Sequence, residues 1–292
     1  MNFKCLQLLL KEDVVEFCMS RKIIDNHKAC NHCRRPLKLT NNTRNADGVI
    51  WWCPGCAAYT SIRKNSLFYA SHCSISTIIE LLYWWTIKLP VTQASEECEV
   101  SDVTSIAYYK IFRGICLELS LGGEKIGGPG MIVEIDEMKL GKRKFNQGKR
   151  VEGQWCFGGV LRREDKDSPI QCFTVPVPDR SKNTLLPIIK DYIIDGTTIY
   201  SDCWKSYDCL EDEGFVHMNV NHSLHFKDPE TGVHTNTMEG TWNQVRRSLP
   251  KFGTRKEYYH SYLAEFVIRN RLKGQNFFLY LLQNLHQIVK WE

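Results

Sequence analysis

The sequence predicts an α/β protein in which a mixed five-stranded sheet with helices follows a small cysteine-rich unit and a helical segment. Three observations predict this arrangement. Two Cys-x-x-Cys pairs lie near the N-terminus, a stretch with helical periodicity comes next, and strand-like runs alternate with helical ones after residue 131. The chain has 292 residues, of which 43% are hydrophobic and 24% charged, so it is expected to bury a core.

Net charge and hydropathy limit the class of protein without identifying a function. A net charge of +5 is too small to indicate nucleic-acid binding by itself. No run approaches the roughly 18 consecutive apolar residues of a membrane helix. The apolar run in MNFKCLQLLLKEDVVEF is too short for a secretory signal. We therefore expect an intracellular protein with no membrane partner, whose thirteen cysteines favour metal ligation over disulfides.

The motifs CNHC and CPGC predict a zinc ribbon over residues 30–70, after an N-terminal helical segment over residues 1–29. The four expected ligands are Cys30, Cys33, Cys53 and Cys56. Each pair can form a tight knuckle, and four thiolates complete a tetrahedral Zn²⁺ site with no open position for water. One structural zinc ion is therefore expected. The alternative, four reduced cysteines without metal, is disfavoured by the double spacing.

A helical region is expected over residues 71–121. The stretch SISTIIELLYWWTIKLP reads as a helix that Ser74 or Ser76 caps and Pro90 ends. A short helix, a turn and a second helix capped at Ser101 follow, a layout similar to a helix-turn-helix motif.

The second helix of this pair would present Tyr108 and Lys110 to DNA. Helix pairs are common without such a role, so the pattern alone leaves DNA reading open. The glycine-rich stretch GGEKIGGPG, residues 122–130, cannot continue a helix and is expected to be a linker.

The order of elements after the linker predicts the fold of residues 131–272. Three strands (MIVEIDE, QWCFGGVLRRE, IQCFTVPV) precede a helix (SKNTLLPIIKDYI), a strand (TTIYSD), a helix (WKSYDCLEDEG) and a strand (FVHMNV). A last helix, HTNTMEGTWNQVRRSLP, is expected to be capped by Thr235 or Asn236. This is the order of the ribonuclease-H-like fold. A further helix is expected over residues 273–292, after a break around Gly274.

Three acids fall at the ends of these elements. Asp136 lies near the end of the first strand, Asp202 follows the fourth strand, and Glu239 lies in the first turn of the last helix of the domain. Carboxylates that converge repel one another unless a divalent cation neutralises them, and Mg²⁺ or Mn²⁺ prefers such oxygen ligands. The acids Glu134 and Glu137 flank Asp136 and are expected to be structural or surface residues. Strand alternation makes Glu134 the better second choice as a ligand.

A basic run follows the first acidic strand and could hold the backbone of DNA. The candidates are Lys139, Lys142, Arg143, Lys144, Lys149 and Arg150, with Arg246 and Arg247 on the last helix of the domain. A solvated hairpin or a nuclear-localisation patch is the alternative for the run, and a surface role is the alternative for the arginine pair. Arg180 and Lys182, which open the helix after the third strand, are expected to be exposed.

Five segments together resemble the DDE transposases of the Merlin superfamily and their bacterial insertion-sequence relatives. They are VEIDEMKLGKRK, GQWCFGGVLRRE, IYSDCWKSY, HTNTMEGTWNQVRRSLP and EFVIRNRL, and the resemblance extends to the zinc ribbon. It implies cut-and-paste DNA transposition with Asp136, Asp202 and Glu239 as the triad that holds two Mg²⁺ or Mn²⁺ ions. In some bacterial relatives the third position is not glutamate, so Asn236 is a lesser candidate.

The favoured hypothesis is a metal-dependent enzyme that cuts double-stranded DNA at terminal inverted repeats and joins the freed strand to target DNA. One alternative is a host-recruited, sequence-specific DNA-binding protein without transposition activity, which the intact triad disfavours. Another is a ribonuclease-H-like nuclease that does not join strands. The resemblance implies a homodimer or a higher assembly on DNA. Nuclear localisation is expected in a eukaryotic host, and a cytoplasmic one otherwise.

Overall fold

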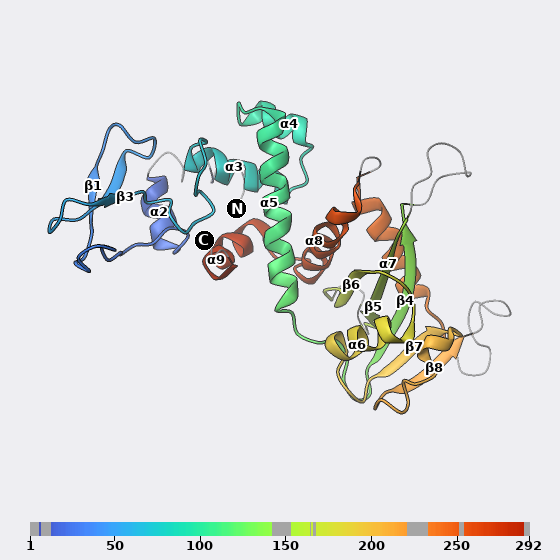
Figure 1. The fold of residues 1–292 in the computed structure, drawn as a ribbon. Coiled ribbons are helices and arrows are strands. Elements are labelled where there is room, and N and C mark those ends of the chain that lie inside the picture. The colour runs from blue at the N-terminus through green and yellow to red at the C-terminus, as the bar shows by residue number, and fades with distance from the viewer. Residues whose placement is uncertain are drawn as a thin grey trace. The chain divides into compact units, whose positions relative to one another are not determined.

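Two compact units make up the chain (Figure 1). The computed structural model describes residue 6 and residues 13–141, 153–163, 165, 168–220, 233–250 and 254–288. The N-terminal unit comprises Met1–Ile115 and Gln275–Glu292, and the sheet unit comprises Cys116–Gly274. The predicted division into six segments stays a prediction.

The N-terminal unit begins with a short helix and a small sheet. The first elements among the described residues are α2 (Val14–Ser20), β1 (Lys38–Asn41), β2 (Val49–Trp52) and β3 (Tyr59–Thr60). Asp13 caps α2, because its carboxylate accepts the N–H groups of Val15 and Glu16. The strands form an antiparallel sheet in the order β1-β2-β3. Strands β1 and β2 lie between the two cysteine pairs of the predicted ribbon, and β3 follows the second pair.

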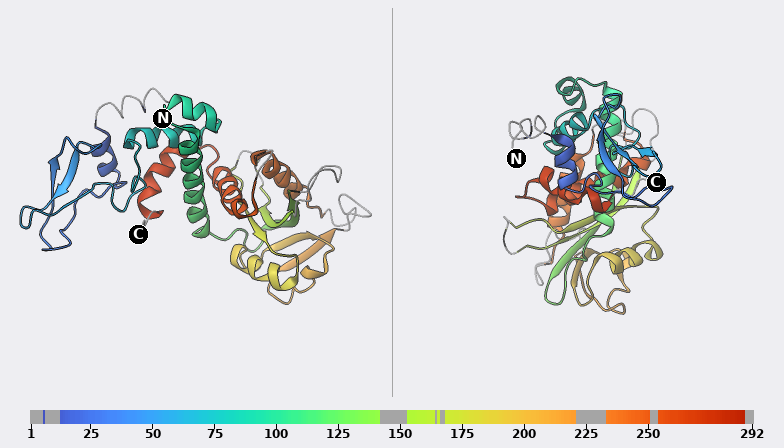
Figure 2. Two further views of the ribbon diagram at one scale, coloured as in Figure 1. Left: turned by 45° about the horizontal axis from the view of Figure 1, so that its top comes forward. Right: turned by 90° about the vertical axis from the view of Figure 1, so that its left-hand side faces the viewer.

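Helices form the rest of the N-terminal unit. They are α3 (Ile75–Thr86), α4 (Val91–Glu97), α5 (Asp102–Leu121), which crosses the unit boundary, and α9 (Phe277–Ile288). Ser74 caps α3 as predicted, and the hydroxyl of Ser101 accepts the N–H of Thr104 at the start of α5. The ring of Tyr83 packs edge-on against Phe278 at 5.5 Å, so α9 lies beside α3 (Figure 2).

The sheet unit contains the predicted mixed five-stranded sheet. Its elements in chain order are β4 (Ile132–Leu140), β5 (Gln154–Leu161), β6 (Cys172–Val177), α6 (Lys182–Tyr192), β7 (Thr198–Asp202), η2 (Lys205–Tyr207), β8 (Val216–Val220), α7 (Asn236–Ser248), η3 (Lys256–Tyr258) and α8 (Tyr259–Arg271). The strand order is β6-β5-β4-β7-β8. Strand β5 pairs antiparallel with both β4 and β6, and β7 pairs parallel with both β4 and β8.

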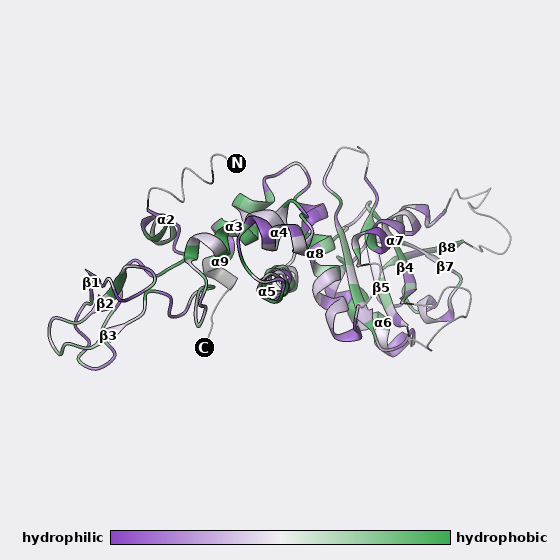
Figure 3. Ribbon diagram, turned by 90° about the horizontal axis from the view of Figure 1, so that it is seen from above, coloured by the Kyte–Doolittle hydropathy of each residue, from purple (hydrophilic) through white to green (hydrophobic). Residues whose placement is uncertain are grey.

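Helices cover both faces of this sheet, because its strands bury side chains on both sides. On one face Ile135 and Phe157 pack with Leu185 and Ile189 of α6. The opposite face packs under α7 and α8, in a cluster that includes Trp242. Figure 3 shows hydrophobic residues along the strands and hydrophilic ones on α6 and α7. None of the helices in the described part of the chain combines the length and apolarity that crossing a bilayer requires.

The helix predicted over WKSYDCLEDEG is wrong, because only the 3₁₀ turn η2 forms there and turns follow it up to Gly214. Tyr207 and Leu210 are both buried, so the turns still place one side of the segment against the core. The start of the segment is held from outside, since the Trp204 indole N–H and the Ser206 hydroxyl both donate to the carbonyl of Arg180.

The glycine-rich stretch expected to be a linker packs on the sheet unit. Ile126 bridges to Ile193 and is 6% exposed. Gly127 has φ +93°, and a Cβ there would lie 2.4 Å from the Thr197 hydroxyl oxygen, so only glycine fits. The N–H of Gly128 donates to the same hydroxyl at 2.8 Å.

Candidate active site and metal centre

The register of two parallel strands brings the first two predicted acids together. β4 and β7 pair in parallel, with Glu134 opposite Tyr200. The same register carried two residues further places Asp136 opposite Asp202, where β7 ends. A carboxylate oxygen of each residue lies within 4.8 Å of the other, and both side chains are half-buried.

A third carboxylate that sequence reasoning assigned to structure joins this pair. One oxygen of Glu137 lies within the same 4.8 Å of Asp136 and Asp202. Strand alternation places Glu137 on the α6 face, opposite to Asp136, but the Tyr207 hydroxyl donates to its carboxylate and holds it at this edge. No local sequence signal marks this contact, because Tyr207 lies seventy residues further along the chain.

The close carboxylates have a clear electrostatic consequence. Burial, followed by the neighbouring Glu137 carboxylate, raises the pKa of Asp136 to about 7, and Asp202 and Glu239 contribute to the same rise. Burial also raises the pKa of Glu137, against the hydrogen bond from Tyr207 that lowers it. Three partly desolvated carboxylates at this distance form an oxygen donor set that fits a divalent cation, which would offset their repulsion.

The third predicted acid approaches from a helix. Glu239 lies in the first turn of α7, is exposed, and is close enough to act electrostatically on Asp136. Its carboxylate does not belong to the 4.8 Å group found among the described residues. The lesser candidate Asn236 is the first residue of α7 and is also exposed.

Glu134 fixes the start of that helix rather than joining the acidic group. It is fully buried, and its carboxylate accepts the N–H of Met238 at 2.9 Å and the hydroxyl of Thr237 at 2.8 Å. Thr235 precedes α7 as predicted, but its side chain makes no capping hydrogen bond. A strand carboxylate therefore caps α7 in its place, where the helix dipole favours negative charge. The prediction that Glu134 is the better second choice as a metal ligand is wrong, because Glu137 and not Glu134 joins the acidic group.

An arginine completes the Glu134 network. The Nε of Arg162 donates to Glu134 at 2.5 Å, and its Nη2 donates to the carbonyl of His234 at 3.0 Å. The guanidinium lies 4.6 Å from the ring centroid of Tyr200. Arg162 thus connects Glu134 with the residue before Thr235 and with Tyr200 on β7.

The cysteine pairs form a second candidate metal centre. The four sulfurs of Cys30, Cys33, Cys53 and Cys56 lie within 4.8 Å of one another. The Cys30–Cys56 and Cys33–Cys53 sulfur distances are 3.5 Å and 3.4 Å. Tetrahedral zinc bonds of about 2.3 Å would place sulfurs about 3.8 Å apart, so the donor set fits Zn²⁺. Backbone N–H groups of Cys33 and His32 lower the pKa of Cys30, whereas hydrogen bonds with the Cys30 and Cys53 sulfurs raise the pKa of Cys56 to about 12.

The two knuckles share one backbone pattern. The N–H of Arg34 donates to the carbonyl of Cys30, and the N–H of Ala57 donates to the carbonyl of Cys53, both at 2.9 Å. Arg34 and Ala57 both have positive φ, at +61° and +59°. Two turns of the same geometry therefore face each other, as a closed structural metal site requires.

Metal removal is expected to unfold the ribbon. Zinc binding in small domains contributes on the order of 10 kcal/mol to folding, so a chelator or Cys53→Ser should abolish amide protection at Trp51, which is 4% exposed. Hydrogen exchange and zinc content together measure this. Cys73→Ser, a half-buried cysteine outside the group, is the control and should behave as wild type. Full protection at Trp51 in metal-free protein would contradict a structural role for the ion.

The predicted DNA-contacting residues differ in how exposed their side chains are. Lys110, Arg246 and Arg247 are exposed, and Lys139 is half-buried. Tyr108 is 8% exposed and its hydroxyl donates to Ser71, a position that suits packing. The remaining candidates, Lys142, Arg143, Lys144, Lys149 and Arg150, lie outside the described residues.

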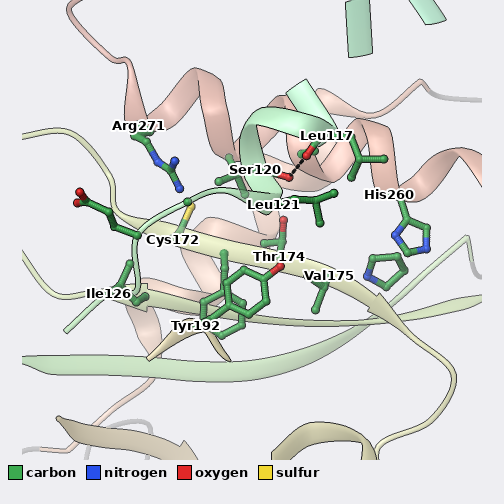
Figure 4. Close-up of a pocket in the computed structure, with 16 residues that line it drawn as sticks. Leu117, Ser120, Leu121, Ile126, Cys172, Thr174, Val175, Tyr192, His260 and Arg271 are labelled. Carbon is green, nitrogen blue, oxygen red and sulfur yellow. Dashed lines mark hydrogen bonds between the residues drawn. The ribbon is translucent and has the colours of Figure 1, made fainter. Parts of the chain in front are cut away.

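A cavity of about 230 Å³ lies elsewhere in the sheet unit. Figure 4 shows it between β6, which contributes Thr174 and Val175, and Tyr192, His260 and Arg271 from the helices. None of the clustered carboxylates lines it. The acidic group is therefore a site at the edge of the sheet, distinct from this cavity.

Comparisons with known proteins identify the family of the chain. The model of a family described as the ISXO2-like transposase domain matches residues 125–270. A transposase-like protein of Haemophilus influenzae is 38% identical over 122 residues, which cover 40% of this chain and 93% of that protein. A protein in the transposable element ISH50 of Halobacterium salinarum is 26% identical over 278 residues, covering 82% of this chain and 91% of that protein. The predicted resemblance to insertion-sequence transposases is confirmed.

Proposed function

Since this chain belongs to the family of ISXO2-like transposase domains, we propose that it is a metal-dependent DNA transposase of the cut-and-paste type. It would cut phosphodiester bonds at the ends of its element and transfer the freed strand to target DNA. The observation that carries the proposal is the meeting of Asp136 and Asp202 at one edge of the sheet, with Glu239 approaching from α7.

Asp136, Asp202 and Glu239 would hold two Mg²⁺ or Mn²⁺ ions, and the ribbon cysteines one Zn²⁺ ion. Bound divalent ions would activate a water or a 3′-hydroxyl and stabilise the leaving oxygen of a phosphodiester. Glu137 supplies a further carboxylate to the same edge, and Tyr207 orients it. Glu134 holds the first turn of α7, and with it the backbone of Glu239, in place.

Double-stranded DNA would be held through its phosphates by basic side chains around this edge. Lys139 lies three residues beyond Asp136 on β4, and Arg246 and Arg247 are exposed in the last turn of α7. The family resemblance implies a homodimer or a higher assembly on DNA, and this assembly belongs to the proposal.

A cleavage and strand-transfer assay tests the proposal. The substrate is duplex DNA that carries the sequences flanking the gene, with Mg²⁺ or Mn²⁺ in one arm and Ca²⁺ or a chelator in the other. We expect cutting and joining only with Mg²⁺ or Mn²⁺. End-specific binding without cutting would indicate a DNA-binding protein, and cutting without joining would indicate a nuclease. Either result would overturn the proposal.

A further inference from the structure

Two tryptophans hold one arginine beside the acidic group. The guanidinium carbon of Arg180 lies 4.2 Å from the ring centroid of Trp155 and 4.3 Å from that of Trp204. Both contacts are within the range of cation–π interaction, which orients a planar guanidinium as well as attracting it. The expectation that Arg180 is simply exposed is wrong, because its side chain is 31% exposed.

The backbone of Arg180 is hydrogen-bonded to the segment that follows Asp202 at the end of β7. The carbonyl of Arg180 accepts the indole N–H of Trp204 at 3.1 Å and the hydroxyl of Ser206 at 2.9 Å. The N–H of Trp204 in turn donates to the carboxylate of Asp202 at 3.2 Å. Arg180 is thus placed by the same segment that places a predicted metal ligand, so the position of its guanidinium relative to the acidic edge is set in advance.

Among the residues that the structure describes, no hydrogen bond from the guanidinium of Arg180 is found. Among the described residues its charged partner is Glu137, whose carboxylate lies 4.0 Å from Nη1, too far for a hydrogen bond. Glu137 also accepts the hydroxyl of Tyr207, and the pairing of Arg180 with this acid at 4.0 Å leaves the planar face of the guanidinium to the two tryptophan rings. An arginine that is oriented by stacking and keeps open N–H groups is suited to bind a phosphate, which two parallel N–H groups can contact together.

A second cation extends the same surface. The Nζ of Lys139 lies 5.4 Å from the ring centroid of Trp155. Lys139 and Trp155 are cross-strand partners on β4 and β5, and Trp155 packs on the α6 face of the sheet. Trp204 is 38% exposed at the other side of Arg180. Two cations and two aromatic rings in mutual contact form the kind of surface that binds a nucleic-acid strand.

We propose that Arg180, held against Trp155 and Trp204, binds a backbone phosphate of the DNA strand that enters the acidic site. The inference rests on the proposed function for the identity of the strand. Arg180 is a binding residue that positions the strand, and Trp155 and Trp204 position Arg180. Lys139 adds charge to the same path.

Binding of DNA without catalysis tests this inference. The probe is a 30-base-pair duplex with the flanking end sequence, titrated in Ca²⁺ buffer at several salt concentrations and followed by fluorescence anisotropy. Arg180→Gln is expected to weaken binding about tenfold at fixed salt and to lower the slope of log K against log salt by about one. Arg180→Lys should keep the slope, because it keeps the charge, and lose part of the affinity, because it loses the planar fork.

The matched control is Lys182→Gln, which removes one exposed positive charge two residues away. This variant is expected to change the affinity for the duplex less than threefold at the same salt concentration, because a single exposed charge contributes little. Equal binding by Arg180→Gln and Lys182→Gln would overturn the inference, and a thermal melt checks that both variants fold. Binding without cutting by the wild type would contradict the proposed function and leave this inference standing. Normal cutting with unchanged binding by Arg180→Gln would contradict this inference alone.

Discussion

Replacing Asp136 by asparagine is expected to slow metal-dependent DNA cleavage by about 10³-fold. The proposed metal ions contribute several kcal/mol to transition-state stabilisation, and a loss of about 4 kcal/mol corresponds to this factor. Asparagine has nearly the same shape as aspartate but offers a single neutral oxygen, so the variant isolates the charge. Single-turnover cleavage of the flanking-end duplex in Mg²⁺ measures the effect.

The fold of the Asp136→Asn variant is expected to be intact or more stable without metal. Asp136 is partly desolvated and its carboxylate lies close to those of Glu137 and Asp202, so a neutral side chain removes repulsion. Mn²⁺ should raise the melting temperature of the wild type through binding to the folded state, and this rise should vanish in the variant. Asp208→Asn, the same change at an exposed carboxylate, is the control. Wild-type cleavage by Asp136→Asn would remove Asp136 from the proposed metal site.

Replacing Glu134 by alanine is expected to destabilise the sheet unit by about 3 kcal/mol or more. Removing one partner of a buried ion pair leaves the other charge uncompensated, which costs about 3–5 kcal/mol. Here the change also strands the N–H of Met238 and the hydroxyl of Thr237. Arg162 retains some contact with water, since its side chain is 23% exposed, so the lower end of the range applies.

Native-state hydrogen exchange measures this loss best, because a chain of two units need not unfold in one step. The amides of Phe157 and Val160, whose side chains are fully buried on β5, report on the sheet unit. Glu134→Gln keeps one oxygen acceptor but loses the second acceptor and the charge, so it should cost less than Glu134→Ala and still destabilise the sheet unit. Glu265→Ala removes a partner of Arg269 within α8 and should cost less than Glu134→Ala, because neither side chain of this pair is fully buried and no helix start loses its cap. Equal losses in Glu134→Ala and Glu265→Ala would show that Glu134 does not anchor α7.

Much of the fold could be predicted from local patterns. Strand alternation, helical periodicity and caps such as Ser74 act within a few residues, so they are visible in the sequence. The same holds for the cysteine-rich ribbon, since each knuckle is a four-residue turn that begins and ends with a cysteine. The prediction of a helix over WKSYDCLEDEG is wrong, and no local pattern indicates the reason. The side chains of Trp204 and Ser206 at its start donate to the carbonyl of Arg180, more than twenty residues earlier in the chain.

The candidate site divides in the same way. The sequence by itself determined that Asp136 and Asp202 lie on neighbouring strands and that Glu239 lies in the first turn of a helix, because element order sets these positions. The expectation that Asp136 lies near the end of its strand is wrong, because β4 continues to Leu140 and Asp136 lies in its middle. The tertiary structure alone decided that Glu137 joins the acids, that Glu134 caps α7 and that Arg180 stacks on two tryptophans. Each of these contacts joins side chains far apart in the sequence. Their partners are set by how sheet and helices pack, which no local spacing encodes.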